Sequence, residues 1–129
     1  MASIAEYRED IDKYYTLKGK ITRIINELDS AAQSAEGLEN EVASNFKVNN
    51  DAAKLSSRIG ILDHGLTDTA DFLRNTILPS IDDAITGARN EISRLEAEER
   101  RRQEEEERRR REEEEAMERE MEMEEWLPT

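Results

Sequence analysis

An apolar stripe of helical period runs through the first third of the chain. Its members recur every three or four residues and are Ile4, Tyr7, Ile11, Tyr14, Leu17, Ile21, Ile24, Leu28, Ala31, Ala35, Leu38 and Val42. Eleven steps over 38 residues give a mean spacing of 3.45. This is the coiled-coil repeat of about 3.5 rather than the 3.6 of a straight helix, and a strand would require strict alternation instead. The stripe predicts a long helix over residues 3–45, opened by the capping box of Ser3 and Glu6.

A second apolar stripe follows with a similar period. It consists of Leu55, Ile59, Leu62, Leu66, Leu73, Ile77, Ile81, Ala84, Ala88, Ile92 and Leu95. The stripe predicts a helix over residues 50–95. Pro79 has no backbone N–H to donate and should kink this helix. His64, Gly65 and Ser80 are typical of helix ends, but the stripe keeps its phase across them, which favours one kinked helix over three short ones.

The residues between the two stripes have the composition of a turn. Three Asn and one Asp fall within residues 44–51, and such residues favour turns and helix N-caps. We therefore expect an antiparallel helical hairpin over residues 3–95, with Phe46 and Val48 folded back over its end. In this hairpin residue i faces about residue 96 minus i. The alanines of residues 31–35 then face the glycines of residues 60–65, and Tyr14 and Tyr15 lie near residues 81–82.

A hairpin of two helices has one buried seam, which is too narrow for all the apolar residues of this chain. Adjacent apolar pairs widen both stripes beyond a single seam. Exposed apolar area of this extent is typical of an interface, and a homo- or heterodimeric four-helix bundle would cover it. The residues predicted to bind a protein partner, with aromatic side chains as anchors, are Tyr14, Tyr15, Phe72, Leu73, Ile77, Leu78 and Ile81.

The composition changes at about Leu95. Residues 96–129 carry 16 acidic and 8 basic residues, a net charge of −8 out of −13 for the chain. Each of Glu104–Glu107 stands four residues before an Arg, an order that stabilises a helix by about 0.2–0.5 kcal/mol per pair. No apolar face is present, so the tail is expected to be a solvent-exposed single α-helix that continues the second helix. Trp126 and Leu127 at its end form either a docking motif or an incidental tail.

The residue types that catalysis and metal binding need are scarce. The chain has no cysteine, one histidine and five scattered glycines, so a thiol nucleophile, a cysteine zinc site and a phosphate-binding loop are all excluded. His64 has Asp63 beside it but no nucleophile to activate. We therefore predict no catalytic, cofactor-binding or metal-binding residues and no enzymatic activity.

The charge and the apolar runs limit the partners and the location. A sequence pI of about 4.6 disfavours nucleic acid, because phosphate binding requires clustered cations. No apolar run approaches the roughly 20 residues of a membrane span, and the first residues lack the basic and apolar regions of a signal peptide. We expect a cytoplasmic protein, or one exported without a cleavable signal peptide.

The hairpin resembles the small helical proteins of bacterial type VII secretion, the Trp-x-Gly superfamily, and within it the YwqH-like partners encoded beside LXG toxins. The resemblance covers about residues 3–95 and rests on two helices of about 40 residues, the Asn-rich turn and the stretch from Ile77 to Ile81, followed by Ile85, Ile92 and Leu95. The sequence departs from the superfamily in having no Trp-x-Gly in its turn and no Tyr-x-x-x-Asp/Glu export signal after the second helix.

The resemblance implies a targeting factor or chaperone, without an export signal of its own, that binds the helical N-terminal domain of a secreted toxin. Two other classes remain open on the residues alone. One is a coiled-coil scaffold in which the charged helix is a spacer. The other is an acidic antagonist that masks a basic partner.

Overall fold

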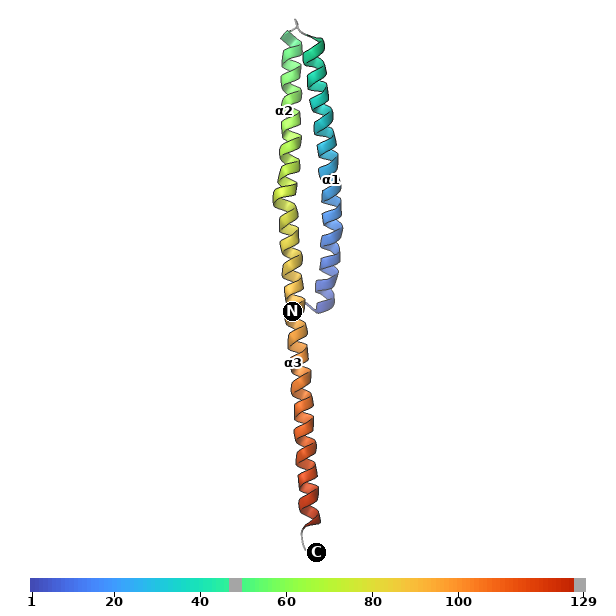
Figure 1. The fold of residues 1–129 in the computed structure, drawn as a ribbon, viewed down its shortest axis with the longest axis vertical. Helices are drawn as coiled ribbons and strands as arrows, with labels where there is room; N and C mark the ends of the chain where they lie inside the picture. Colours follow the sequence, from blue (N-terminus) through green and yellow to red (C-terminus); the bar gives the residue numbers. More distant parts are fainter. Residues whose placement is uncertain (47–49, 127–129) are drawn as a thin grey trace.

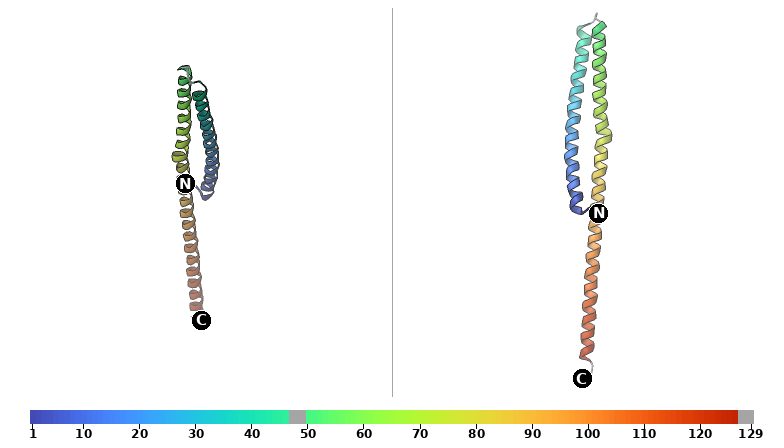
Figure 2. Two further views of the ribbon diagram at one scale, coloured as in Figure 1. Left: turned by 45° about the horizontal axis from the view of Figure 1, so that its top comes forward. Right: turned by 180° about the vertical axis from the view of Figure 1, so that it is seen from behind.

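The computed structural model describes residues 1–46 and 50–126, which form helices and no strand. The elements are α1 (Ile4–Asn45), α2 (Asn50–Phe72), η1 (Leu73–Ile77, a π-helical turn) and α3 (Leu78–Glu125). Figure 1 shows α1 lying alongside α2 and the first part of α3, with the rest of α3 extending beyond the hairpin as a rod. The same arrangement is seen from the two other directions of Figure 2. The predicted all-α hairpin, with a second helix that continues as a charged single helix, is confirmed.

The ends of α1 follow from local hydrogen bonds. The Oγ atom of Ser3 accepts the Glu6 backbone N–H at 3.2 Å, so Ser3 is the N-cap as predicted. The Glu6 carboxylate accepts the Ser3 hydroxyl at 3.2 Å, where the predicted capping box would have it accept the Ser3 backbone N–H. At the other end the Phe46 N–H donates to the Val42 carbonyl at 3.2 Å. The Phe46 side chain is exposed, however, and does not close the end of the hairpin as predicted. Val48 lies outside the described residues.

The buried seam of α1 is a strict heptad repeat. Apart from Asp29, the helical residues that are buried or partly buried alternate in steps of three and four: Ile4, Tyr7, Ile11, Tyr14, Lys18, Ile21, Ile25, Leu28, Ala32, Ala35, Glu39 and Val42. In the heptad numbering used below, Ile4 is the first residue at position a and Tyr7 is the first residue at position d. Four members of the predicted stripe are therefore misplaced, because Lys18, Ile25, Ala32 and Glu39 occupy the seam in place of the residue before each. Long Lys and Glu side chains tolerate seam positions because their stems pack while their charged ends reach water.

The seam of the second helix has the same repeat with one extra residue. It runs through Ala52, Ser56, Ile59, Asp63, Leu66, Ala70, Leu73 and Ile77, and it resumes at Leu78, Ile81, Ile85, Ala88, Ile92 and Leu95. Ile77 and Leu78 both occupy an a position. The turn η1 accommodates this extra residue, because the Leu78 N–H donates to the Leu73 carbonyl five residues back instead of four.

Pro79 follows this wide turn directly. Proline has no N–H for the carbonyl of Asn75, and its ring would crowd that carbonyl in a regular α-helix. A π turn relieves the crowding because it widens the backbone at this point. At the place where Pro79 was predicted to kink the second helix, the structure has a π turn over Leu73–Ile77, just before the proline, and this turn keeps the apolar seam in phase.

The two halves of the hairpin seam differ in packing. The core cluster consists of Ile21, Ile25, Ala70, Ile81 and Ile85, with partly buried Ile11, Tyr14, Leu28, Leu73, Ile77 and Leu78 packed against it. Towards the turn the buried residues are small, such as Ala32, Ala35 and Ala52. Gly60 lies opposite Glu39, whose carboxylate oxygen would be 3.0 Å from an added Cβ. The predicted pairing of this glycine with the alanines of residues 31–35 is therefore wrong.

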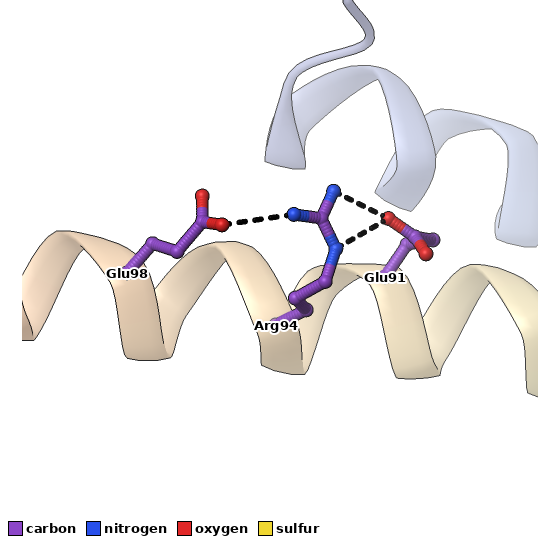
Figure 3. Close-up of polar contacts among 3 residues, drawn as sticks. All are labelled: Glu91, Arg94 and Glu98. Carbon is purple, nitrogen blue, oxygen red and sulfur yellow. Dashed lines mark hydrogen bonds and ion pairs between the residues drawn. The ribbon is translucent and has the colours of Figure 1, made fainter.

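A small ion-pair cluster marks the point where α3 leaves the hairpin. Figure 3 shows Arg94 between Glu91 and Glu98, beside the first turns of α1. The guanidinium donates to Glu91 at 2.8 and 3.0 Å and to Glu98 at 2.9 Å. The hydrogen bond that Arg94 donates to Glu91, aided by both carboxylate charges, raises the pKa of Arg94. Every described residue after Glu98 is exposed, which makes the rest of α3 a solvated single helix.

Candidate functional site

One flank of the hairpin is covered by polar contacts between the helices. The side chains of Arg8 and Glu96 are 3.2 Å apart, those of Lys18 and Asp82 2.8 Å, and those of Asp29 and Arg74 2.8 Å. Apart from Lys18, which is at an a position, these residues are at heptad position e of their helix. We call this side, together with Tyr15 and Arg89, the ion-paired flank.

Tyr15 belongs to the same flank. The Arg89 guanidinium donates to the Tyr15 hydroxyl and lies 5.7 Å from the centre of its ring. A cation at this distance from an aromatic ring is attracted to it. Tyr15 was predicted to bind a partner, but in the hairpin it bridges α1 and α3.

The opposite flank is apolar. In an antiparallel pair, residues at heptad position g of both helices line one side, just as those at e line the other. Between the middle of α1 and the middle of α2 the g positions are apolar, and we call these six residues the apolar flank: Leu17, Ile24, Ala31 and Leu38 on α1 and Leu55 and Leu62 on α2. The g positions outside this part are mostly polar, among them Asp10, Thr69 and Glu91. The five large side chains of the apolar flank are between 44% and 58% exposed. The hairpin therefore displays a row of leucine and isoleucine along α1 that meets two further leucines near the turn.

The structure separates the residues that were predicted to form one binding face. Ile81 is buried in the core cluster. Tyr14, Leu73, Ile77 and Leu78 are partly buried against that cluster and belong mainly to the hairpin itself. Phe72 is 56% exposed, at position c next to the apolar flank.

The register explains part of this difference. Lys18, not Tyr14 or Tyr15, lies opposite Asp82, and Tyr15 contacts Arg89 instead. All six members of the apolar flank were predicted to belong to the two apolar stripes that form the seam. A strict alternation of three and four from Ile4 would have placed the four α1 members at g, and this signal was present in the sequence.

The tail carries a separate group of exposed apolar side chains. Met117, Met121, Met123 and Trp126 are all exposed near the end of α3. Trp126 and Met123 line a shallow hollow together with Arg119 and Glu122. Leu127, the other residue of the predicted docking end, lies outside the described residues.

Neither a metal-ion cluster nor a membrane-spanning helix is found among residues 1–46 and 50–126. These residues contain no group of three or more His, Asp and Glu residues placed to hold a metal ion. Within the same ranges, no helix has the length and apolar character that a membrane span requires. His64 is exposed on α2.

Comparison with known proteins gives no relative from which a function can be transferred. The chain matches no family model, no curated protein and no solved structure. The structure is an all-α helical hairpin with an extended charged helix, and its two flanks are the features that bear on function.

Proposed function

We propose that the protein is a non-enzymatic helical binding partner whose apolar flank packs against helices of another protein. The observation that carries this proposal is the division of the hairpin into two sides. The ion-paired flank satisfies its polar groups within the chain, whereas the apolar flank leaves five large aliphatic side chains about half exposed. Exposed apolar rows at heptad spacing are the usual contact surface of a further helix.

The partner that we propose is the helical N-terminal domain of an LXG-type toxin of type VII secretion, with this chain acting as its targeting factor or chaperone. The resemblance of residues 3–95 to the helical partners of such toxins supports this choice. The structure adds a flank with the right chemistry, because a helical toxin domain would complete a four-helix bundle on it.

The proposal is tested by co-expression with such a toxin domain and co-purification through a tag on the toxin. Leu62→Asp places a charge on the apolar flank. Its matched control is Ile61→Asp, because Ile61 is a neighbouring exposed aliphatic residue at position f, facing away from the flank. We expect Leu62→Asp to abolish co-purification and Ile61→Asp to retain it. Equal retention by both variants would contradict the proposal.

A coiled-coil scaffold is a second candidate, favoured by the tail. Residues 99–125 continue α3 as an exposed helix, and at 1.5 Å per residue the stretch from residue 96 to 125 spans roughly 45 Å. Such a rod suits a spacer between the hairpin and another structure. A scaffold would form a stable homo-oligomer that persists when the toxin domain is present, whereas a toxin partner would exchange any homo-oligomer for the complex.

A further inference from the structure

The apolar flank of α1 is symmetric about its own middle. Leu17 and Leu38 are equally far from the point between residues 27 and 28, and so are Ile24 and Ala31. Two copies of α1 that meet antiparallel about this point would place Leu17 against Leu38 of the other copy. Ile24 would then meet Ala31, a large side chain against a small one.

The charges beside this row are complementary about a point only half a residue away. Lys13 and Glu41 are both at heptad position c, which borders g, and they are equally far from residue 27. In the antiparallel pair Lys13 of each copy lies beside Glu41 of the other. The Lys13 side chain is well exposed, and within the chain its ammonium lies 3.4 Å from the exposed carboxylate of Glu9. One like-charge meeting remains, because Glu27 lies on the symmetry axis next to its own copy.

The second helix fits the same axis. Asp29 contacts Arg74, so the axis passes the second helix near residue 74. Phe72 lies within one turn of that level, exposed at position c, and would approach Phe72 of the other copy. Reflection about residue 74 places Leu62 near the level of residue 86, between the partly buried g residues Ala84 and Glu91 of α3.

We propose that a second copy of this chain covers the apolar flank, in an antiparallel four-helix bundle whose two-fold axis crosses α1 between residues 27 and 28. The tails favour this arrangement over the parallel one. Each tail carries a net charge of −8, arranged in alternating Glu and Arg blocks along the helix. In a parallel pair each block would lie beside the identical block of the other copy. A parallel pair would place the two tails side by side with like charges opposed, whereas the antiparallel pair directs them to opposite ends.

The dimer uses the same flank that the proposed function assigns to a toxin domain. If that function holds, the second copy covers the flank until a toxin domain binds. The inference does not depend on that function, because it rests on the symmetry and charge of this chain alone. A toxin domain would have to displace the second copy. Sedimentation of the purified chain tests the dimer, and co-purification with a toxin domain tests the function, so the two can fail separately.

The first experiment is sedimentation equilibrium of the full chain and two variants. We expect a mass of twice 14.9 kDa for the unmodified chain and for Ile61→Asp, and a single-chain mass for Leu62→Asp with its helical circular dichroism retained. A monomeric unmodified chain would overturn the inference. A dimer that survives Leu62→Asp as well as it survives Ile61→Asp would overturn the assigned flank.

The second experiment determines the direction of the helices. The chain has no cysteine, so single cysteines report contacts without a background. Lys13→Cys and Glu41→Cys chains are mixed, allowed to exchange and treated with a short bismaleimide. The antiparallel dimer predicts a cross-link between the two different chains and none within either variant alone. Absence of this cross-link would refute the antiparallel arrangement. Cross-linking between tails that carry Glu115→Cys would refute it as well and would identify a parallel dimer.

Discussion

The Lys18 ammonium lies 2.8 Å from the Asp82 carboxylate, and this contact joins a seam position of α1 to the ion-paired flank of α3. A lysine at a seam position weakens a coiled coil, but it specifies the register of the two helices when an oppositely charged side chain is present on one side only. Here that side chain is Asp82, which lies on the flank with the ion pairs between Arg8 and Glu96 and between Asp29 and Arg74. The polar groups of the hairpin therefore fix its alignment on one side and leave the other side to apolar residues.

The core and the flank should respond differently to truncation. Ile85 is 3% exposed, so Ile85→Ala should lower the free energy of unfolding by about 2–5 kcal/mol. Phe72 is 56% exposed, so Phe72→Ala should change the stability of the isolated protein little, while weakening its assembly. Chemical denaturation and co-purification on the same two variants give both quantities. Loss of stability with retained assembly for Phe72→Ala would place Phe72 in the fold instead of the interface.

The π turn should be coupled to Pro79. Deletion of exposed Thr76 removes the extra residue of the seam and places Pro79 inside a regular α-helix, which should cost roughly 3 kcal/mol or more. The same deletion combined with Pro79→Ala should be tolerated, because the seam stays in phase without a proline. Urea unfolding of the two single variants and the double variant measures the coupling. Additive effects would show that the turn and the proline are independent.

Two glycines of α2 should separate helix propensity from packing. An added Cβ at Gly65 meets nothing within 4 Å, so Gly65→Ala should stabilise the hairpin by about 0.5–1 kcal/mol. At Gly60 the Cβ would lie 3.0 Å from the Glu39 carboxylate, which must move aside, so Gly60→Ala should gain less. The thermal midpoints of the two variants provide the comparison. An equal or larger gain at Gly60 would mean that the helices do not approach closely there.

The charged end of α3 should be dispensable for folding. All described residues after Glu98 are exposed, and none packs on the hairpin. Truncation after Glu99 keeps Arg94 between its two carboxylates and should leave the thermal midpoint nearly unchanged. Circular dichroism should lose helical signal in proportion to the residues removed. A large fall in the midpoint would indicate that the tail packs against the hairpin.

The symmetry axis predicts an effect of Glu27 on assembly. Glu27 would lie beside its own copy, and like charges at close range repel even when exposed. Glu27→Gln should therefore tighten the dimer, most clearly at low ionic strength where screening is weak. Dilution series in the ultracentrifuge at two salt concentrations measure this. A weaker dimer or no change at low salt would argue against an axis at this position.

The sequence was sufficient for the fold class but insufficient for the phase of the seam. Apolar spacing predicted the hairpin, and Pro79 predicted an interruption of the second helix. A stripe drawn from apolar residues alone, however, places Leu17, Ile24 and Leu38 in the seam, because the charged residues Lys18 and Glu39 look unsuitable for it. The π turn was invisible for a related reason: one extra residue changes the mean spacing very little, and only the burial of both Ile77 and Leu78 reveals it. The predicted binding residues mix buried and exposed positions for the same reason, since seam leucines and exposed leucines differ in phase and not in chemistry.

Oxidative footprinting of Leu62 and Ile61 tests the central claim most directly. Both side chains are exposed in the hairpin and adjacent in the chain, so hydroxyl radicals reach them under identical conditions and one peptide reports both. The experiment compares the assembled protein with a dilution at which it is monomeric. The apolar flank predicts that assembly lowers the oxidation of Leu62 several-fold and leaves that of Ile61 unchanged. Equal protection of the two residues, or protection of Ile61 alone, would contradict it.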